Sequence, residues 1–316
     1  MPTKMTSAVV KEIKALKIQG ASKVGEALVK TMGREALENP AKTVPALRRE
    51  LREALYMLAS ARPTEPGTRT AARIILRAVN SPAENLGELR RMVSETCAKY
   101  TKNRQAALKT MAGYGANLIP KGSVVLTHCH SHTVEAILVK ARPKIKYVIN
   151  TETRPRLQGR ITSQNLAKAG LEVVHIVDSA ASSFIGEANL FITGCDAILA
   201  DGSIANKIGT RQISLAAEKE GVPHYVASST HSFDPVTYFG IPEKIEERDA
   251  GEVWERKVKG VTIRNPAFDI TEGEYIDGII TEKGVFAPET LALLMYEEME
   301  VAKKKAADFS LIKMLG

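Results

Sequence analysis

Apolar residues recur with the period of an α-helix through the first 118 residues of the chain. For example, Leu47, Leu51, Leu55 and Leu58 lie three or four positions apart, which places them on one helical face. This period, with proline-containing breaks between segments, predicts five helices. They are expected around residues 9–16 and over 22–37, 44–61, 68–79 and 82–118. Because no strand pattern interrupts them, this part is predicted to be a helical domain.

Beyond Pro120, short apolar runs replace the helical period. Such runs are typical of buried strands, and they are expected at 123–127, 147–149, 172–176, 197–200 and 224–227. Helical patterns lie between several of them, at 134–140, 161–169 and 210–220. Buried strands that alternate with helices indicate a parallel sheet with right-handed crossovers. The sequence therefore predicts an α/β protein with a helical domain over 1–118 and a Rossmann-like domain over 119–316.

The chain has features of a protein of the cytoplasm. No run of about 18 or more apolar residues is present, so no membrane-spanning helix is expected. The first 17 residues carry spaced lysines without the apolar core of a secretory signal. Three cysteines in 316 residues do not make a disulfide framework and favour a reducing compartment.

The net charge of +8 favours an anionic partner. Because basic residues are mixed with 36 acidic ones and aromatics make up only 5%, a small phosphorylated molecule is favoured over nucleic acid. The sequence contains neither a G-x-G-x-x-G after the first predicted strand nor a G-x-x-x-x-G-K-[ST] motif. These absences disfavour a dinucleotide-dependent oxidoreductase and a P-loop NTPase, and no cofactor is predicted.

Polar segments follow several predicted strands. In open parallel sheets, ligands bind beyond the carboxyl ends of the strands. Cys129 and the segments 154–158, 201–207 and 228–232 are therefore expected to meet at one rim of the sheet.

Cys129 lies between His128 and His130, with His132 close behind. A thiol beside a protonated imidazole loses its proton more readily and can act as a base or nucleophile. A buried structural cysteine and a zinc site are the alternatives. Because neighbouring residues of an extended strand point to opposite faces, ligands from one hexapeptide converge poorly, and no metal site is predicted.

A carboxylate and an anion site are expected nearby. Asp196 and Asp201 bracket the predicted strand 197–200, and either could move protons if burial raised its pKa. Position alone does not choose between them. The segment from Asn206 to Thr210 leads into a predicted helix, whose free backbone N–H groups attract phosphate. Lys207 adds a positive charge, and Gly209 permits close approach of the backbone.

These segments together resemble the superfamily of initiation factor 2B regulatory subunits and sugar-phosphate isomerases. The resemblance rests on the Cys129 segment, on 151–159, on 194–198 and on 202–210. Two N-terminal segments, 19–21 and 62–66, also fit, so that it extends over nearly the whole chain.

The resemblance implies an aldose–ketose isomerase without a redox cofactor. Its catalytic pair maps onto Cys129, as a thiolate that takes the C2 proton, and Asp196, as a protonated acid; this favours Asp196 over Asp201. Substrate-binding roles fall on residues expected to hold phosphates or hydroxyls: Gln19, Gly20, Ala21, Ser22, Arg62, Gln158, Asn206 and Lys207. The helical domain would cover the rim and exclude water.

Three branches of the superfamily fit the chain. His130-Ser131-His132, where methylthioribose 1-phosphate isomerases typically have Asn-Ala-Gly, favours the archaeal branch that converts ribose 1,5-bisphosphate in AMP metabolism. The third branch is a non-catalytic regulatory subunit that binds a nucleotide or sugar phosphate and contacts initiation factor 2. Gln19 and Ser232 stand where the isomerases usually carry cations, which leaves the sugar phosphate open. The resemblance also implies a dimer or hexamer and a possible nucleotide activator.

Overall fold

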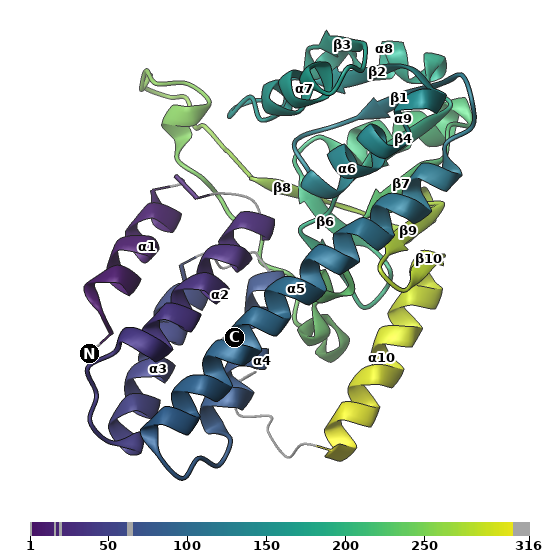
Figure 1. Ribbon diagram of the computed structural model, residues 1–316. Helices are drawn as coiled ribbons and strands as arrows, with labels where there is room; N and C mark the ends of the chain where they lie inside the picture. The colour runs from purple at the N-terminus through teal and green to yellow at the C-terminus, as the bar shows by residue number, and fades with distance from the viewer. Residues whose placement is uncertain (1, 16, 19–20, 62–65, 306–316) are drawn as a thin grey trace. The chain divides into compact units, whose positions relative to one another are not determined.

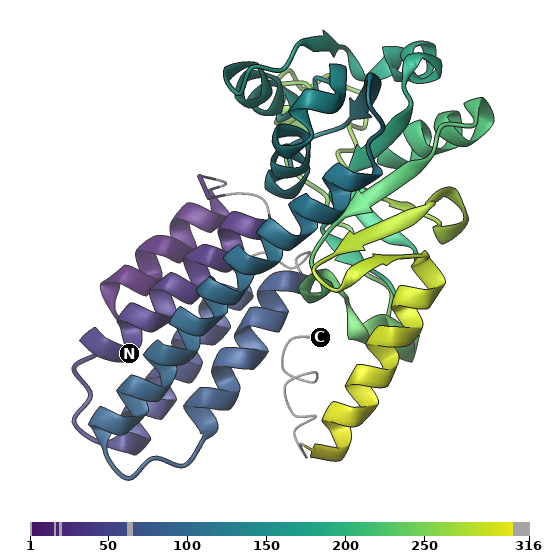
Figure 2. The same cartoon turned by 45° about the vertical axis from the view of Figure 1, so that its right-hand side comes forward.

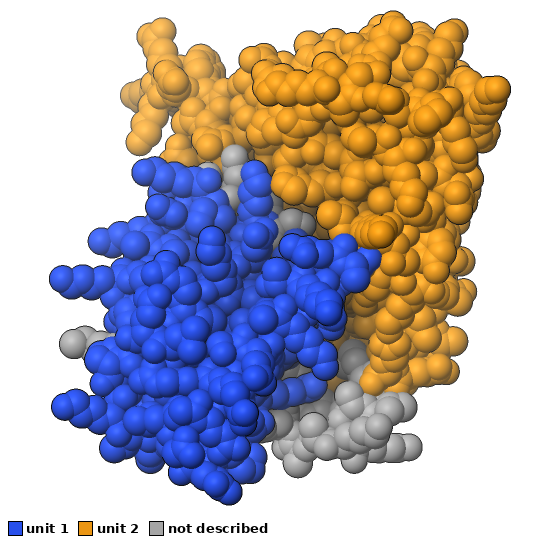
Figure 3. Space-filling model, viewed as in Figure 1, with its two compact units in different colours: residues 1–106, 305–316 blue, residues 107–304 orange. Residues whose placement is uncertain are grey.

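The computed structural model describes residues 2–15, 17–18, 21–61 and 66–305 (Figure 1). These residues form two compact units (Figure 3). One contains the described residues up to Ala106 together with Lys305, and the other contains Ala107–Lys304. The units divide within a long helix, whereas the sequence places the domain boundary where that helix ends, after residue 118.

The first unit is helical, as the periodicity predicts. Its helices are α1 (Lys4–Lys14), α2 (Ala21–Glu38), α3 (Val44–Ala59), α4 (Pro66–Asn80) and the first part of α5 (Leu86–Leu118). Helix α2 packs against α3 and α4 (Figure 2). The stripe of α3 is buried, with Leu47, Leu51 and Leu58 fully enclosed in the core of this unit.

The second unit is built on a seven-stranded, mostly parallel sheet, which confirms the predicted α/β class. The order across the sheet is β10 (Gly284–Phe286), β9 (Gly278–Thr281), β7 (His224–Ala227), β4 (Leu190–Thr193), β1 (Ser123–Thr127), β2 (Ile145–Thr151) and β3 (Val173–Ile176). All neighbours pair in parallel except β9 and β10. The chain runs outward from β1 to β3 and then returns to the other side of β1 through β4. In open parallel sheets, such a reversal marks the carboxyl ends of the two strands, here β1 and β4, as the usual place for a ligand.

Helices cover both faces of this sheet (Figure 1). Val125 of β1 packs with the end of α5, α6 (His132–Lys140) and α7 (Gly159–Lys168). Val124 and Leu126 point to the other face and pack with α8 (Ala181–Phe184) and α9 (Thr210–Glu220). Alternation along the strand thus produces two apolar layers.

Short 3₁₀ helices span Arg142–Lys144, Asp178–Ala180, Ile185–Glu187, Thr230–Ser232, Pro235–Phe239, Ala250–Glu252 and Gly273–Tyr275.

A small antiparallel sheet lies in the same unit, with β6 (Ile204–Lys207) between β5 (Ala197–Ile198) and β8 (Phe268–Thr271). The prediction that 197–200 belongs to the parallel sheet is therefore wrong. That place belongs to β4, a strand that the apolar pattern does not predict. Both segments are short buried apolar runs, and periodicity does not tell which partner a strand takes. Helix α10 (Pro288–Lys305) contributes Leu291 to the core beside β5 and β6.

None of the helices in the described part of the chain is both long enough and apolar enough to cross a membrane.

Candidate active site

His128 connects three segments at the carboxyl end of β1. Its Nε2 lies 3.0 Å from the carbonyl oxygen of Ile208, and its Nδ1 lies 2.6 Å from Oγ1 of Thr151. The carbonyl can only accept, so Nε2 carries the proton and the Thr151 hydroxyl donates to Nδ1. Burial lowers the pKa of His128 to about 4, against the attraction of Asp178. The ring is therefore neutral near pH 7, so among the three neighbouring histidines His128 is not the protonated imidazole that would activate Cys129.

We expect acid to destabilise the fold through its buried histidines. Burial also lowers the pKa of His224, on β7, to about 3. As pH falls from about 6.5 to about 4, His128 and His224 take up protons in the unfolded chain before the folded one. The free energy of unfolding should therefore fall by an amount on the order of a few kcal/mol.

Urea unfolding of wild type and a His224→Gln variant at stepped pH measures this effect. The variant should lose part of the pH dependence, while His175→Gln, which alters an exposed histidine of β3, should behave as wild type. Burial raises the pKa of Asp269 to about 6, so its protonation stabilises the folded protein as the pH falls. Wild type and His224→Gln share this effect, so it cancels when their free energies of unfolding are compared. Identical pH dependence in wild type and His224→Gln would contradict a neutral buried His224.

Gly209 lies against the His128 ring. Its φ is +106°, and a Cβ at this position would lie 3.1 Å from Nε2 of His128. We expect Gly209→Ala to destabilise the protein by about 1–3 kcal/mol and to disturb the rim, because alanine meets both an unfavourable φ and a rigid buried ring. Gly221→Ala is the matched control, since Gly221 has a φ of +67° with nothing within 4 Å of its Cβ position. Thermal unfolding should show a clearly larger loss for Gly209→Ala; equal losses would refute the contact with His128.

Cys129 follows His128 and is half-buried with a free thiol. Its Sγ lies 3.9 Å from Oε1 of Gln158, the residue that precedes α7. Burial raises the pKa of the Cys129 thiol to about 11, and the Lys207 ammonium opposes this rise. Cys129 is therefore a thiol at neutral pH, whereas the resemblance implies a thiolate during catalysis.

Three non-glycine residues in the described part of the chain have a positive φ: Cys129 (68°), Thr153 (63°) and Leu157 (57°). Such backbone costs about 1–3 kcal/mol per residue and is common at functional sites. Here hydrogen bonds hold the backbone of Cys129 and Thr153 in this conformation. The Cys129 N–H donates to Oγ1 of Thr153 at 3.0 Å, and the Thr153 N–H donates to Oδ1 of Asp178 at 2.8 Å. Neighbouring Arg154 donates its N–H to Oδ2 of Asp178 at 2.6 Å, and its bond to Pro155 is cis.

Asp178 was not among the sequence-predicted residues. It follows β3, and its position after a strand is the signal that could have identified it. It acts by positioning the β2–α7 loop that faces Cys129.

The fold distinguishes the two candidate carboxylates. Asp196 follows β4, is half-buried, and its negative charge acts to raise the pKa of Cys129, so it lies near the thiol. Its N–H donates to the carbonyl oxygen of Ala205 at 2.9 Å, which joins it to β6. Asp201, by contrast, is exposed and accepts from the N–H of Ser203 at 2.9 Å, as a turn residue does. The pairing of Asp196 with Cys129 stays a prediction.

Lys207 ends β6 and is only 6% exposed. Its Nζ lies 4.5 Å from the centre of the Phe268 ring, and the described residues place no carboxylate within ion-pair distance of it. Because buried charges are normally paired, this ammonium is a strong candidate for an anion contact. Its positive charge reaches both Cys129 and His128.

Neighbouring Asn206 is buried, and its side-chain amide donates to Oγ1 of Thr210 at 2.9 Å. This hydrogen bond connects β6 to the first residue of α9.

The start of α9 is occupied by a carboxylate of the protein itself. Oδ2 of Asp269 accepts from the N–H of Gly209 at 2.7 Å and from the N–H of Arg211 at 3.2 Å. The expectation that these amides are free to bind phosphate is therefore wrong. The cause is the pairing of β8 with β6, which sets Asp269 opposite Asn206. Nothing in the local sequence of the helix indicates this partner.

The structure brings Cys129, Gln158, Asp196 and Lys207 to one region of the second unit. Ser232 ends the 3₁₀ helix that follows β7, and its hydroxyl oxygen accepts from the hydroxyl of Ser228 at 3.0 Å. Asn206, which precedes Lys207 in β6, also belongs to the second unit, and the other predicted residues come from the N-terminal part of the sequence. Gln19, Gly20 and Arg62 lie outside the described residues, while Ala21 and Ser22 begin α2 without described side chains.

Several known proteins are similar to this chain over most of its length. The ribose 1,5-bisphosphate isomerase of Methanocaldococcus jannaschii is 39% identical over 282 residues, which cover 88% of this chain and 90% of that protein. The 5-deoxyribose 1-phosphate isomerase of Moorella thermoacetica is 34% identical, with 87% and 84% covered.

Two solved structures from Pyrococcus horikoshii OT3 share the fold, each at 29% identity. The translation initiation factor eIF-2B has a TM-score of 0.78 and covers 91% of this chain and 98% of its own. The 5-methylthioribose 1-phosphate isomerase has a TM-score of 0.77 and covers 92% and 87%. The sequence pattern of one family matches residues 17–288, which include every predicted site residue. The chain therefore belongs to the Initiation factor 2 subunit family.

Proposed function

We propose that this protein is an aldose–ketose isomerase that converts ribose 1,5-bisphosphate into ribulose 1,5-bisphosphate. The broader class of reaction is that of a sugar-phosphate isomerase, the class to which relatives 34–39% identical over most of its length belong. The observation that supports the proposal is that the charges of both Lys207 and Asp196 act on the pKa of the Cys129 thiol. A base, an acid and an unpaired cation are the groups that this reaction requires.

The two proton carriers have distinct roles. Asp196 donates a proton to the ring oxygen as the bond from that oxygen to C1 breaks. Cys129, as a thiolate, takes the proton from C2, which leaves an enol between C1 and C2. Cys129 then returns its proton to C1, while Asp196 recovers one from the C2 hydroxyl, so that C2 becomes the ketone. No electrons leave the substrate, and both side chains return to their starting states.

The raised pKa of Cys129 gives Lys207 a further role. Because the resting group is a thiol beside the Asp196 carboxylate, its proton must leave as the substrate binds. Transfer of this proton to Asp196 would form the thiolate base and the protonated acid together. The ammonium of Lys207 favours the thiolate, and it also attracts a substrate phosphate. Gln158, 3.9 Å from the sulfur, is placed to hold a hydroxyl near C2. Asn206, the other residue predicted to hold a hydroxyl, would need to exchange its bond to Thr210.

The proposal is tested by incubating the full chain with ribose 1,5-bisphosphate and, separately, with methylthioribose 1-phosphate. Carbon-13 NMR detects the ketone that forms at C2. We expect turnover of the bisphosphate and at least tenfold lower kcat/KM for the methylthio compound, which lacks the second phosphate. Repeating the assay with added nucleoside monophosphates tests for an activator, and sedimentation tests for the expected dimer or hexamer.

A second candidate function is a regulatory subunit that binds a nucleotide or sugar phosphate without converting it. It is favoured by the similarity to the eIF-2B structure at a TM-score of 0.78. It predicts no ketone from either sugar phosphate, together with capture of initiation factor 2 by the immobilised protein. Turnover that depends on Cys129 would exclude it.

A further inference from the structure

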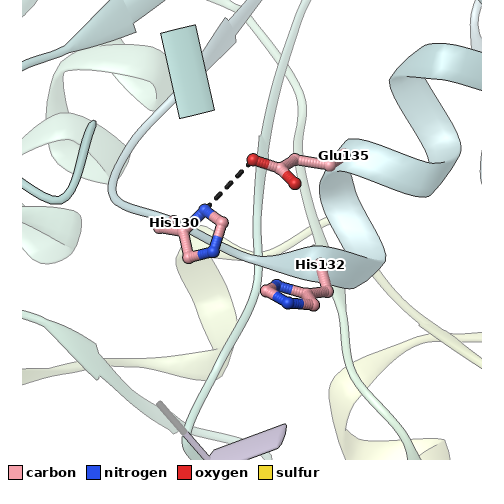
Figure 4. Close-up of side chains that lie close together, drawn as sticks. All are labelled: His130, His132 and Glu135. Carbon is pink, nitrogen blue, oxygen red and sulfur yellow. Dashed lines mark ion pairs between the residues drawn. The ribbon is translucent and has the colours of Figure 1, made fainter. Parts of the chain in front are cut away.

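Two histidines and a glutamate form a cluster at the start of α6 (Figure 4). One ligand atom from each of His130, His132 and Glu135 lies within 4.8 Å of the other two. The two imidazole rings meet edge to face, with ring centres 4.8 Å apart. Two imidazoles and one carboxylate form a ligand set that suits zinc and neighbouring divalent metals.

The local backbone explains why these side chains converge. The expectation that ligands of the hexapeptide diverge assumes an extended strand, but β1 ends at Thr127 and Cys129 has a positive φ. Oγ of Ser131 then accepts from the N–H of Val134 at 3.4 Å and caps α6. His132 is the first residue of that helix and Glu135 follows three positions later, so both lie on one helical face.

Hydrogen bonds orient the His130 ring. Its Nδ1 lies 3.0 Å from a Glu135 oxygen and 3.0 Å from Oγ1 of Thr162. The Thr162 hydroxyl donates to the carbonyl oxygen of Cys129 at 3.1 Å, so it accepts from His130. Nδ1 therefore carries a proton, and Nε2 is the nitrogen that can offer a lone pair to a metal. Nε2 is buried and has no hydrogen-bond partner among the described residues.

Glu135 supplies the negative charge of the cluster. The side-chain amide of Asn165 donates to its two oxygens at 3.1 and 3.2 Å. An ionised carboxylate with supporting hydrogen bonds is typical of metal ligands.

We propose that His130, His132 and Glu135 bind a divalent transition-metal ion of the zinc class. Three protein ligands leave a position for water, and the exposed His132 gives the ion access from solvent. The site is separate from the Cys129 thiol, which faces Gln158. A bound ion would fix the loop that presents Cys129, because His130 and Ser131 connect that residue to α6.

Titration of the full chain, free of any polyhistidine tag, with zinc chloride alone tests the proposal. Isothermal titration calorimetry should give one zinc ion per chain. His132→Gln and Glu135→Gln should each weaken binding at least about tenfold, and Asn165→Ala should weaken it by about 10–100-fold. His175→Gln, which replaces an exposed histidine outside the cluster, and Cys129→Ser should bind zinc as wild type does.

Cobalt(II) provides a readout of the ligand type. Its visible spectrum should show ligand-field bands without a sulfur charge-transfer band, and circular dichroism should show that every variant is folded. Absence of stoichiometric binding would show that the cluster is only an ion pair and would overturn the proposal. Binding that survives both His132→Gln and Glu135→Gln, or that is lost in Cys129→Ser, would also overturn it. Because no sugar phosphate is present, the outcome is independent of the isomerase assay.

Discussion

Cys129→Ser is expected to reduce kcat for the isomerisation by about 10²–10⁴-fold, while the substrate still binds. The serine hydroxyl is nearly the size of the thiol, so the loop held by Thr153 should keep its shape. A hydroxyl is, however, a far weaker acid than even the buried thiol, whose pKa is about 11. The variant therefore cannot present the anion that removes the proton from C2. Turnover followed by NMR and binding followed by calorimetry separate the two effects.

Cys97→Ala provides the matched control for loss of a thiol. Cys97 is buried in the helical core of the first unit, and its Cβ lies 3.3 Å from the position that a Cβ on Gly33 would take. This variant should lose some stability and keep its kcat. Normal turnover by Cys129→Ser would refute the assignment of Cys129 as the base, whatever the substrate.

Asp196→Asn is expected to reduce kcat to a similar extent, because an amide cannot donate a proton to the ring oxygen and then recover one. Asparagine retains the shape of the side chain and leaves the backbone bond to Ala205 intact. The neutral amide also removes a negative charge near Cys129, which acts to raise the pKa of the thiol. Alkylation of Cys129 by iodoacetamide should therefore begin at a lower pH in Asp196→Asn than in wild type.

Asp201→Asn is the control that the sequence itself suggests, since both aspartates bracket the same short segment. Asp201 is exposed and accepts from the N–H of Ser203, which an asparagine oxygen also does. The kcat of Asp201→Asn should stay within about twofold of wild type, as expected for a surface substitution away from the site. The assignment fails if Asp201→Asn is the inactive variant and Asp196→Asn the active one.

Asp196→Asn and a Lys207→Met variant also test the raised pKa of Cys129. If the thiol loses its proton only when substrate binds, the rate of alkylation should increase as a slowly converted substrate analogue with a phosphate is added to Asp196→Asn. Lys207→Met should abolish this increase, because it removes the cation that favours the thiolate. A rate unchanged by the analogue would show that binding does not shift the thiol, and another group would then have to take the C2 proton.

Local patterns were sufficient for much of the secondary structure. The helical period predicts α3, α4 and α9 to within a few residues, and the run Ser123–Thr127 coincides with β1. Strand β4 was missed because a four-residue apolar run carries little periodicity, and 197–200 was placed in the wrong sheet for the same reason. A period fixes which face of an element is buried, but it does not identify the partner that covers it.

In the candidate active site, too, the sequence determines some properties and the tertiary structure determines others. The sequence by itself determined which residue types are present: a thiol, carboxylates and a lysine, each placed after or at the end of a short strand. Only the tertiary structure decided how they act, because pKa values and hydrogen bonds depend on burial and on groups distant in the chain. Burial makes His128 neutral and Cys129 a thiol, and the pairing of β6 with β8 places Asp269 at the start of α9. The turn after β1 brings His130 to His132 and Glu135, which the alternation of an extended strand does not allow.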